Sequence, residues 1–452
     1  MFRLLLLLSS LAFWFLLLIV CPVSARTWRV PADASTIQAG VDSSAAGDTV
    51  LVAPGAYNES EIVLKSGIVL RGETGVPRST SINGQQSGSV LLCINVDSTC
   101  CIEALTISGG YALNGGGGIF CFYAHPTITN CLFIENIALA HDGGGIACLH
   151  SSPLVTDCQF LANRANWGGG GVSCNQSQAR FVNCTFNGNQ ANTGAGIGFS
   201  GRSDIEVIGC TFVGNIGSAG GGLASYSSFC HVTGCTFSEN DAHKGAGIYT
   251  SGSNIAVFNT LIAYNEGLAF KCSPEGLASD IQISCSDLYG NTGGDWTECI
   301  ESFQALNANL SVPPGFCNPA AKDFTLSAES PCLPENNDCA VLIGAHGAGC
   351  SMASAASDIF PSLSIDGIHP NPSNPLTTVH FSLQTGQQTH IAIYEPSGRR
   401  LVVLADRHFS AGSHVVVWDG KDAAGRAVAS GIYFVKVTGA RAWRAEKLVL
   451  VR

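Results

Sequence analysis

Two short phrases recur together along this 452-residue chain, at a spacing of 25 to 27 residues. The first is glycine followed by Ile, Val or Leu, and it begins at Gly118, Gly145, Gly171, Gly196, Gly222 and Gly247. The second is Cys-x-Phe-x-x-Asn, beginning at Cys131, Cys158, Cys184, Cys210 and Cys235, with a degenerate sixth copy at Thr260. Matched copies at a fixed period indicate a solenoid, in which each repeat packs only on its neighbours.

Each repeat is predicted to hold three short strands, and the glycine phrase opens one of them. A second strand carries an apolar column at Ile128, Val155, Phe181, Val207, Val232 and Val257. Two residues later stand Asn130, Asp157, Asn183, Gly209, Gly234 and Asn259, which are residue types that tolerate a left-handed bend. The Cys-x-Phe pair begins the third strand. Three strands and three bends per coil predict an all-β parallel β-helix, and no window has the apolar spacing of a helical solenoid.

Stacking places like residues above one another, about 4.8 Å apart. The phenylalanines are expected to fill the core. The asparagines from Asn136 to Asn265 are expected to pass hydrogen bonds from coil to coil, a structural role that we favour over ligand binding. The five cysteines from Cys131 to Cys235 are expected to be buried thiols, because their Cβ vectors run parallel, and their spacing does not fit zinc.

The first 25 residues predict an export signal. Arg3 precedes the apolar run from Leu4 to Val20, and Val23-Ser24-Ala25 fits a cleavage site. A retained membrane anchor and a lipoprotein attached through Cys21 are the alternatives. No other segment is predicted to cross a membrane. Disulfides are permitted after export, and we expect them in the cap that carries Cys272, Cys285, Cys299, Cys317, Cys332, Cys339 and Cys350. A net charge of −11 without a basic run argues against nucleic acid as a partner.

The segment before the repeats resembles a known family. Val30-Pro31, Thr36-Ile37-Gln38 and the run from Gly47 to Gly55 look like the N-terminal signature of right-handed β-helix proteins of the pectin-lyase-like superfamily. Ser35 can cap a short helix that covers the first coil. The repeated phrases also resemble those of bacterial polymorphic outer-membrane adhesins. These resemblances imply a right-handed parallel β-helix over residues 26–350.

The composition changes after residue 350. Residues 351–361 form a predicted linker, and residues 362–452 alternate strand-like runs with turns such as Asp419-Gly420. About seven short strands predict an Ig-like β-sandwich. The phrases Trp418-Asp419-Gly420 and Gly431-Ile432-Tyr433 resemble the FlgD-type Ig-like domain, which is similar to sorting domains of type IX secretion. The resemblance implies attachment to a cell surface, with secretion machinery as a partner.

We predict no catalytic residue, cofactor or metal site. Lyases that the chain resembles carry calcium-binding acids and a basic residue on one exposed strand face. The corresponding outward positions here are neither acidic nor basic: Phe120, Ala147, Ser173, Gly198, Ala224, Tyr249, Phe122, Leu149, Asn175, Ser200, Tyr226 and Ser251. A second row, Arg180, Glu206 and His231, is expected to be a solvated ion-pair row.

The turn before each glycine phrase supplies the candidate glycan contacts, which are His141, Asp142, Trp167, Asn192 and His243. Trp167 can stack on a sugar ring while the others hydrogen-bond to hydroxyls. The favoured hypothesis is a secreted or cell-surface protein with a structural, adhesive or glycan-binding role, whose partner is an extracellular polysaccharide or a surface partner. The alternative is a polysaccharide lyase or glycoside hydrolase that works from these loops.

Overall fold

The computed structural model describes residues 25–139, 143–273, 279–350, 363–383, 386–396, 399–439 and 443–452. The predicted signal peptide, apart from Ala25, and the predicted linker 351–361 lie outside these residues. The chain divides into two compact units, the first made of the residues up to Leu326 with Ser330–Gly347, and the second dominated by Ala348–Arg452. Each unit is described by itself.

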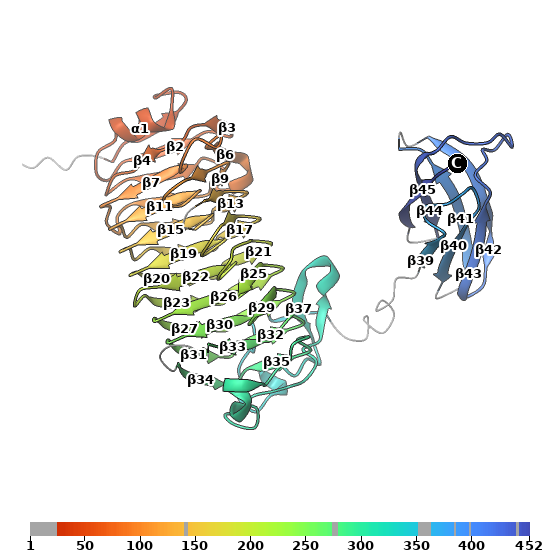
Figure 1. The fold of residues 1–452 in the computed structure, drawn as a ribbon. Helices are drawn as coiled ribbons and strands as arrows, with labels where there is room; N and C mark the ends of the chain where they lie inside the picture. Colours follow the sequence, from red (N-terminus) through yellow and green to blue (C-terminus); the bar gives the residue numbers. More distant parts are fainter. Residues whose placement is uncertain are drawn as a thin grey trace, which may run out of the picture. The chain divides into compact units, whose positions relative to one another are not determined.

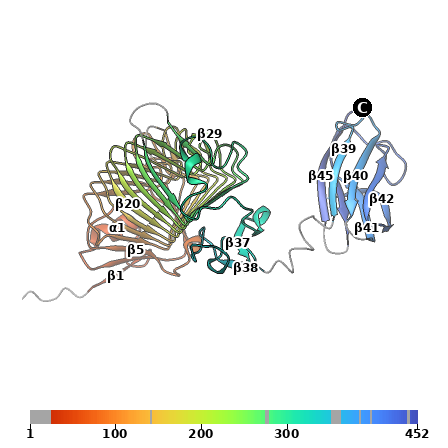
Figure 2. The ribbon, with the colours of Figure 1, turned by 90° about the horizontal axis from the view of Figure 1, so that it is seen from below.

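The first unit is a stack of parallel strands, which Figure 1 shows as a column of coils and Figure 2 shows from below, with successive coils lying over one another. Sheet A, with eleven strands, consists of β1 (Thr27–Val30), β2 (Thr49–Val52), β5 (Val69–Gly72), β8 (Cys101–Glu103), β12 (Thr127–Thr129), β16 (Leu154–Thr156), β20 (Gln178–Val182), β23 (Asp204–Ile208), β27 (Phe229–Thr233), β31 (Asn254–Phe258) and β34 (Asp280–Ser284). The bend that follows this sheet is left-handed, with φ of 49° at Asn130, 53° at Asp157 and 53° at Asn183, as predicted.

Two further long sheets complete the coils. Sheet B, with ten strands, consists of β3 (Gly55–Asn58), β6 (Thr80–Asn83), β9 (Thr106–Ser108), β13 (Leu132–Ile134), β17 (Gln159–Leu161), β21 (Thr185–Asn187), β24 (Thr211–Val213), β28 (Thr236–Ser238), β32 (Leu261–Ala263) and β35 (Asp287–Tyr289). Sheet C, with nine, consists of β4 (Ile62–Val63), β7 (Leu91–Ile94), β11 (Ile119–Phe122), β15 (Ile146–Leu149), β19 (Val172–Asn175), β22 (Ile197–Ser200), β26 (Leu223–Tyr226), β30 (Ile248–Ser251) and β33 (Phe270–Cys272).

Several coils carry a fourth short strand, which the three-strand prediction missed. These strands are β10 (Tyr111–Ala112), β14 (Ile137–Ala138), β18 (Arg164–Ala165), β25 (Ile216–Ala219) and β29 (Asp241–Lys244). They follow the asparagine column and lead into the turn before sheet C. Runs of two to four residues are too short to show a period of two in the sequence, which explains why this strand was not predicted.

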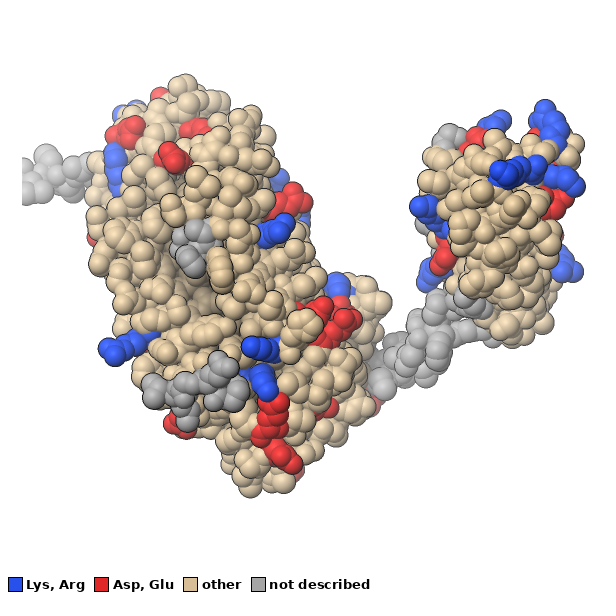
Figure 3. All heavy atoms as spheres, viewed as in Figure 1, with Lys and Arg blue, Asp and Glu red and all other residues tan. Residues whose placement is uncertain are grey.

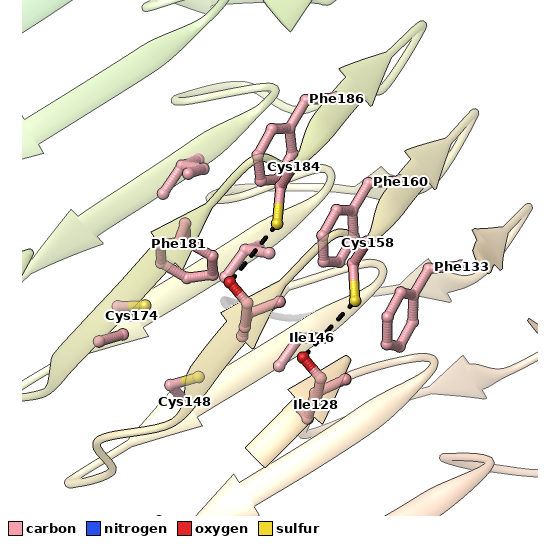
Figure 4. Close-up of a cluster of buried hydrophobic side chains, with 14 of the residues drawn as sticks. Ile128, Phe133, Ile146, Cys148, Cys158, Phe160, Cys174, Phe181, Cys184 and Phe186 are labelled. Atoms are coloured by element: carbon pink, nitrogen blue, oxygen red, sulfur yellow. Dashed lines mark hydrogen bonds between the residues drawn. The ribbon is translucent and has the colours of Figure 1, made fainter. Parts of the chain in front are cut away.

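The phenylalanine column forms the core as predicted. Neighbouring rings from Phe133 to Phe237 stack with centroids 4.4 to 4.8 Å apart and planes within 5° of parallel. The cysteine column lies beside it as buried thiols (Figure 4), and the Cys158 and Cys184 thiols donate to the carbonyls of Ile128 and Val155. The close spacing of like rings confirms that the repeats superimpose in register.

The asparagine column is a hydrogen-bonded ladder, which confirms the structural role. The backbone N–H and the side-chain amide of Asn163 both donate to Oδ1 of Asn189, at 3.0 and 3.1 Å. The same amide donates to the carbonyl of Phe133 at 3.0 Å. The pattern repeats from Asn136 to Asn265 and ends on Asn291. Each rung therefore satisfies buried polar groups of the neighbouring coil.

The first coil is capped by helix α1 (Ile37–Ser43). The predicted helix is present, but its N-cap is Thr36, whose hydroxyl accepts the N–H of Ala39, and not Ser35. The Glu59 carboxylate accepts the N–H groups of Ile37 and Gln38, because the first turn of a helix leaves these donors without partners. Ile37 and Val41 are buried against the first strands, so the helix closes the apolar interior.

The other end of the β-helix is irregular. It holds the 3₁₀ turns η2 (Glu298–Phe303), η3 (Pro319–Ala321) and η4 (Pro334–Asn336) and the antiparallel pair β36 (Phe316–Asn318) and β37 (Asp323–Ser327). The short strand β38 (Ala348–Cys350) belongs to the second unit. Residues 330–347, which we call the flap, fold back over the outer side of sheet B. The His346 ring lies 2.8 Å from the Thr211 hydroxyl, and the Ala345 N–H donates to the Thr236 hydroxyl. Cys332, Leu333 and Ile343 pack there on Leu261 and Ala263.

Disulfides hold this end, as predicted. Cys272 is joined to Cys299 and Cys285 to Cys339, and Cys317 and Cys350 are also disulfide-bonded. Cys332 departs from the prediction. It is a free buried thiol that donates to Oδ2 of Asp287.

The second unit is an antiparallel sandwich. One sheet is ordered β39 (Leu363–His369), β40 (Thr377–Leu383) and β43 (Gly412–Trp418). The other is ordered β42 (Arg400–Phe409), β41 (Gln387–Tyr394), β44 (Gly431–Thr438) and β45 (Trp443–Leu450). Phe381, Ile391, Trp418 and Val435 are buried between the two sheets. The described residues of this unit thus form the predicted Ig-like β-sandwich.

Candidate functional site

The outer face of sheet C was predicted to present two columns of side chains, and the structure exposes them unequally. Ala147 and Ala224 in the first column are buried, because the turns before sheet C fold over them. A Cβ on Gly198 would lie 2.8 Å from the backbone nitrogen of Gly169, so only glycine fits there. The second column, which runs from Phe122 to Tyr226, remains partly exposed.

A groove of about 410 Å³ lies between the second column and the turns, and we call it the Trp167 groove. Its lining consists of Cys148, Leu149, Trp167, Gly168, Ser173, Asn175, Thr193, Gly198, Phe199, Ser200 and Tyr226. The Trp167 side chain is 54% exposed, which leaves much of its indole surface open to a ligand. Figure 3 shows this side of the β-helix as a surface on which uncharged residues predominate.

The turn that carries Trp167 is held by the next coil. The backbone N–H and the hydroxyl of Thr193 both donate to the carbonyl of Trp167, at 2.7 and 3.1 Å. On the floor of the groove, the Asn175 side-chain amide donates to the Ser200 hydroxyl at 2.9 Å. These contacts fix an indole beside amide and hydroxyl groups, and such mixed apolar and polar surfaces suit sugars, which present apolar ring faces and hydroxyl edges.

Tyr226 closes one end of the Trp167 groove. Burial, together with the neighbouring Tyr249, raises the pKa of Tyr226 to about 12, although a hydrogen bond with Thr193 opposes the shift. The two tyrosine rings lie 5.5 Å apart at an angle of 50°. Tyr226 is therefore a neutral phenol at ordinary pH, able both to donate and to accept a hydrogen bond.

The structure separates the predicted glycan contacts. Asn192 and His243 line a second groove of about 440 Å³, together with Arg164, Gln190 and Asp241, over β18, β25 and β29. This groove lies on the other side of the turns from Trp167. Asn166 and Asn192 line it, whereas the next residues, Trp167 and Thr193, line the Trp167 groove, because neighbouring residues of an extended turn point in opposite directions. His141 and Asp142 lie outside the described residues, so the structure leaves their role as a prediction.

Sequence reasoning recorded Asn175, Ser200 and Tyr226 as outward residues without joining them to Trp167, and it did not single out Thr193. The sequence did offer one signal for this site. Tyr226, one repeat after Ser200, is a large aromatic residue in a column that otherwise carries small polar residues there. The distance between the Trp167 turn and the Tyr226 strand could be obtained only from the register of the coils.

Acidic and basic side chains lie on other parts of the β-helix. Arg180 and Glu206 form the expected ion pair on sheet A, 3.0 Å apart and half exposed. His231 follows on the next coil and lines a small depression with Asp280. Asp287 is buried under the flap, and burial raises its pKa to about 7. Within the described part of the chain, no group of three or more His, Cys, Asp or Glu could hold a metal ion.

The stacked coils define the class of this protein, a parallel β-helix with an appended β-sandwich. The chain belongs to the family described as right handed beta helix region, whose model matches residues 66–237 and 165–302, together just over half of the chain. The FlgD Ig-like domain model matches residues 377–442 in the second unit. Both fold predictions, including the right-handed coil, are confirmed.

Solved structures similar to this chain include the pectin methylesterase of Aspergillus niger in deglycosylated form, with 12% identity over 61% of this chain and 87% of that chain and a TM-score of 0.31. The pectin methylesterase PemA of Erwinia chrysanthemi shows 11% identity over 57% and 92%, with a TM-score of 0.26. PorZ of Porphyromonas gingivalis, described as a surface component of the type-IX secretion system, is 26% identical over 19% of this chain, with a TM-score of 0.15. The match spans only 11% of PorZ. No curated protein matches the chain.

Among the residues that the structure describes, no helix is long and apolar enough to cross a membrane. The disulfides are consistent with an extracellular or surface location, because such bonds persist in oxidising compartments.

Proposed function

We propose that this chain is a secreted or cell-surface binding protein that holds an uncharged polysaccharide in the Trp167 groove. The observation that carries the proposal is the lining of the groove. It combines the exposed Trp167 and the partly exposed Tyr226 with the amide of Asn175 and the hydroxyls of Ser173, Thr193 and Ser200. Among the residues that the structure describes, no side chain in the lining is charged at neutral pH. A charged sugar polymer would lose hydration there without gaining an ionic partner, which favours a neutral one.

Export and surface attachment belong to the same proposal. The apolar N-terminal segment with its Val23-Ser24-Ala25 site, and the disulfides at the end of the β-helix, support export. The FlgD-type sandwich would then serve as the module that engages secretion machinery or the cell surface. The β-helix would present the Trp167 groove to the medium as a rigid face.

Binding to immobilised neutral and uronic-acid polysaccharides tests the proposal, with calorimetry on any polymer that retains the protein. Trp167→Ala should weaken binding about tenfold, equivalent to ~1.4 kcal/mol, because it removes one stacking face. Phe229→Ala is the matched control, because Phe229 is 49% exposed, close to the 54% of Trp167, but lies on sheet A. Its affinity should equal that of the unaltered protein.

Two results would contradict a binding role for the Trp167 groove. One is a Trp167→Ala protein that binds as tightly as the unaltered chain. The other is turnover, seen as release of unsaturated or reducing ends from any polysaccharide of the panel, which would favour the lyase or hydrolase alternative. A preference for uronic-acid polymers over neutral ones would overturn the assignment of a neutral ligand.

A further inference from the structure

A second aromatic surface lies on the same column of sheet C, toward the N-terminal end. The rings of Tyr123 and His150 are stacked, with centroids 4.7 Å apart and planes within 9° of parallel. Phe122 meets Tyr123 edge-on at 4.7 Å. The side chain of Tyr123 is 50% exposed, and Phe122 and His150 are half-buried. We call these three residues the Tyr123 platform.

The backbone under the platform adopts a conformation that bulky side chains rarely take. Tyr123 has a φ of 47° and His150 a φ of 49°, both in the left-handed region. Other coils place Asn95, Gln176, Ser227 or Gly252 at a left-handed bend after sheet C. Asparagine and glycine tolerate this region far better than an aromatic residue. Tyr123 therefore occupies a bend at which other coils carry Asn, Ser or Gly, and strained positions of this kind cluster at functional sites.

The platform and the Trp167 groove are aligned by the register of the sheet. Phe122 pairs with Leu149, Leu149 with Asn175, and Asn175 with Ser200. Tyr226 follows on the next coil, and it pairs in turn with Ser251. Leu149 both lines the groove and adjoins Phe122, so the two surfaces are continuous. Four coil steps separate Phe122 from Tyr226, a span of about 19 Å at ~4.8 Å per step.

This stretch of the column has aromatic side chains at both ends and smaller ones between them. Between Phe122 and Tyr226 the column carries Leu149, Asn175 and Ser200, and it continues to Ile94 before Phe122 and to Ser251 after Tyr226. A pyranose ring and its glycosidic bond advance a straight sugar chain by about as much as one coil, ~4.8 Å, advances the column. A β-1,4-linked chain is straight and could therefore follow the column, whereas a strongly curved α-linked chain would leave it.

We propose that the Tyr123 platform is a second sugar-binding subsite, and that the ligand is a straight, neutral β-1,4-linked glycan long enough to reach from Tyr226 to Tyr123. The inference rests on the proposed function, since the Trp167 groove holds the other part of the same chain. One terminal ring contacts the exposed part of Tyr123, whose ring is stacked on that of His150. Rings two coils away contact Trp167, and the ring four coils away contacts Tyr226. Affinity then depends on ligand length up to about five rings and not beyond, because ~19 Å separates the aromatic positions Phe122 and Tyr226.

The test is calorimetric titration of the full chain with β-1,4-linked glucose oligomers of two to eight rings, with the mannose series in parallel. The unaltered protein should gain affinity up to about five rings and then level off. Tyr123→Asn combined with His150→Asn should bind the pentamer about three- to tenfold more weakly and the dimer equally well. Tyr123→Phe, which keeps a ring at the position, should retain the gain with length.

The asparagine variants should fold at least as well as the unaltered chain, because asparagine tolerates a left-handed bend. Thermal unfolding checks this, and Tyr123→Ser, which places at this bend the residue type that Ser227 supplies on a later coil, is a second variant if the first fails to fold. An unchanged length dependence in the folded variants would overturn the subsite but leave the Trp167 groove intact. Failure of every oligomer in both series to bind the unaltered protein would overturn the β-1,4 assignment. A Trp167→Ala protein that keeps full affinity would remove the proposed function itself.

Discussion

The buried carboxyl group of Asp287 should make the stability of the β-helix depend on pH in an unusual direction. Asp287 is fully buried between sheet B and the flap. The Val312 N–H donates to its Oδ1 at 3.1 Å and the Cys332 thiol to its Oδ2 at 3.4 Å. Burial dominates over these two bonds, and the pKa rises from 3.8 to about 7. The native state thus holds a proton that the unfolded chain releases above about pH 4.

The sign of the effect follows from the raised pKa. Below about pH 4 both states carry the proton, and Asp287 has no effect on the free energy of unfolding. Between about pH 4 and pH 7 only the native state is protonated, so stability falls as the pH rises, and above pH 7 the loss is complete. At 1.36 kcal/mol per pKa unit, the free energy of unfolding should be about 3 kcal/mol lower at pH 8 than at pH 5 on account of this group.

Asp287→Asn removes this dependence, because the amide stays neutral and its oxygen can still accept the Val312 N–H. Urea unfolding followed by tryptophan fluorescence measures the effect. Trp296, whose indole N–H donates to the carbonyl of Leu310 near the flap, contributes to this signal. The difference in unfolding free energy between the variant and the unaltered chain should shift by about 3 kcal/mol from pH 5 to pH 8. Asp280→Asn, at an exposed site on β34, is the control. Its difference in unfolding free energy from the unaltered chain should be the same at pH 5 and pH 8. A constant difference for Asp287→Asn would refute the assignment of a raised pKa.

Further predictions concern the columns and the disulfides. Phe186→Ala should lower the free energy of unfolding by about 3–5 kcal/mol, because it leaves a cavity between stacked rings, whereas the exposed Phe229→Ala should stay within about 0.5 kcal/mol. Asn189→Ala should lower the free energy of unfolding by at least about 2 kcal/mol, since two N–H groups of Asn163 lose their acceptor. Denaturant titration measures this, and an unchanged free energy would show that the ladder is dispensable. Mass spectrometry after reduction and alkylation of the folded protein should find label on the six disulfide-bonded cysteines and none on Cys158 or Cys184, and labelled ladder thiols would contradict their burial.

The features that the sequence predicted are those that repeat. Phe160, Phe186 and Phe212 could be placed in one column because a parallel coil returns each residue type to the same position. The asparagine ladder and the left-handed bends followed from the same period. The second unit was predictable from its alternating strands and its turns, such as Asp419-Gly420.

The features that the sequence did not predict depend on contacts without a period. The flap covers sheet B through single contacts, such as His346 with Thr211, across 135 residues of sequence. Trp167 and Asn192 were grouped because they occupy similar turns, but they line different grooves. A difference of one residue in an extended turn reverses the direction of a side chain, and only the three-dimensional geometry of the turn shows which residues share a face.

The asparagine ladder also constrains how such a chain can change in length. Each asparagine from Asn163 to Asn240 bonds to the asparagines of the two adjacent coils and to a phenylalanine carbonyl of the preceding coil. A whole coil of 25 to 27 residues can therefore be duplicated or removed while every remaining amide finds a partner. An insertion of a few residues within a strand would put the rungs out of step and leave buried amides without acceptors. A binding face on this β-helix therefore changes in length by whole coils. Proteins descended from this one would differ in the length of that face by multiples of one coil.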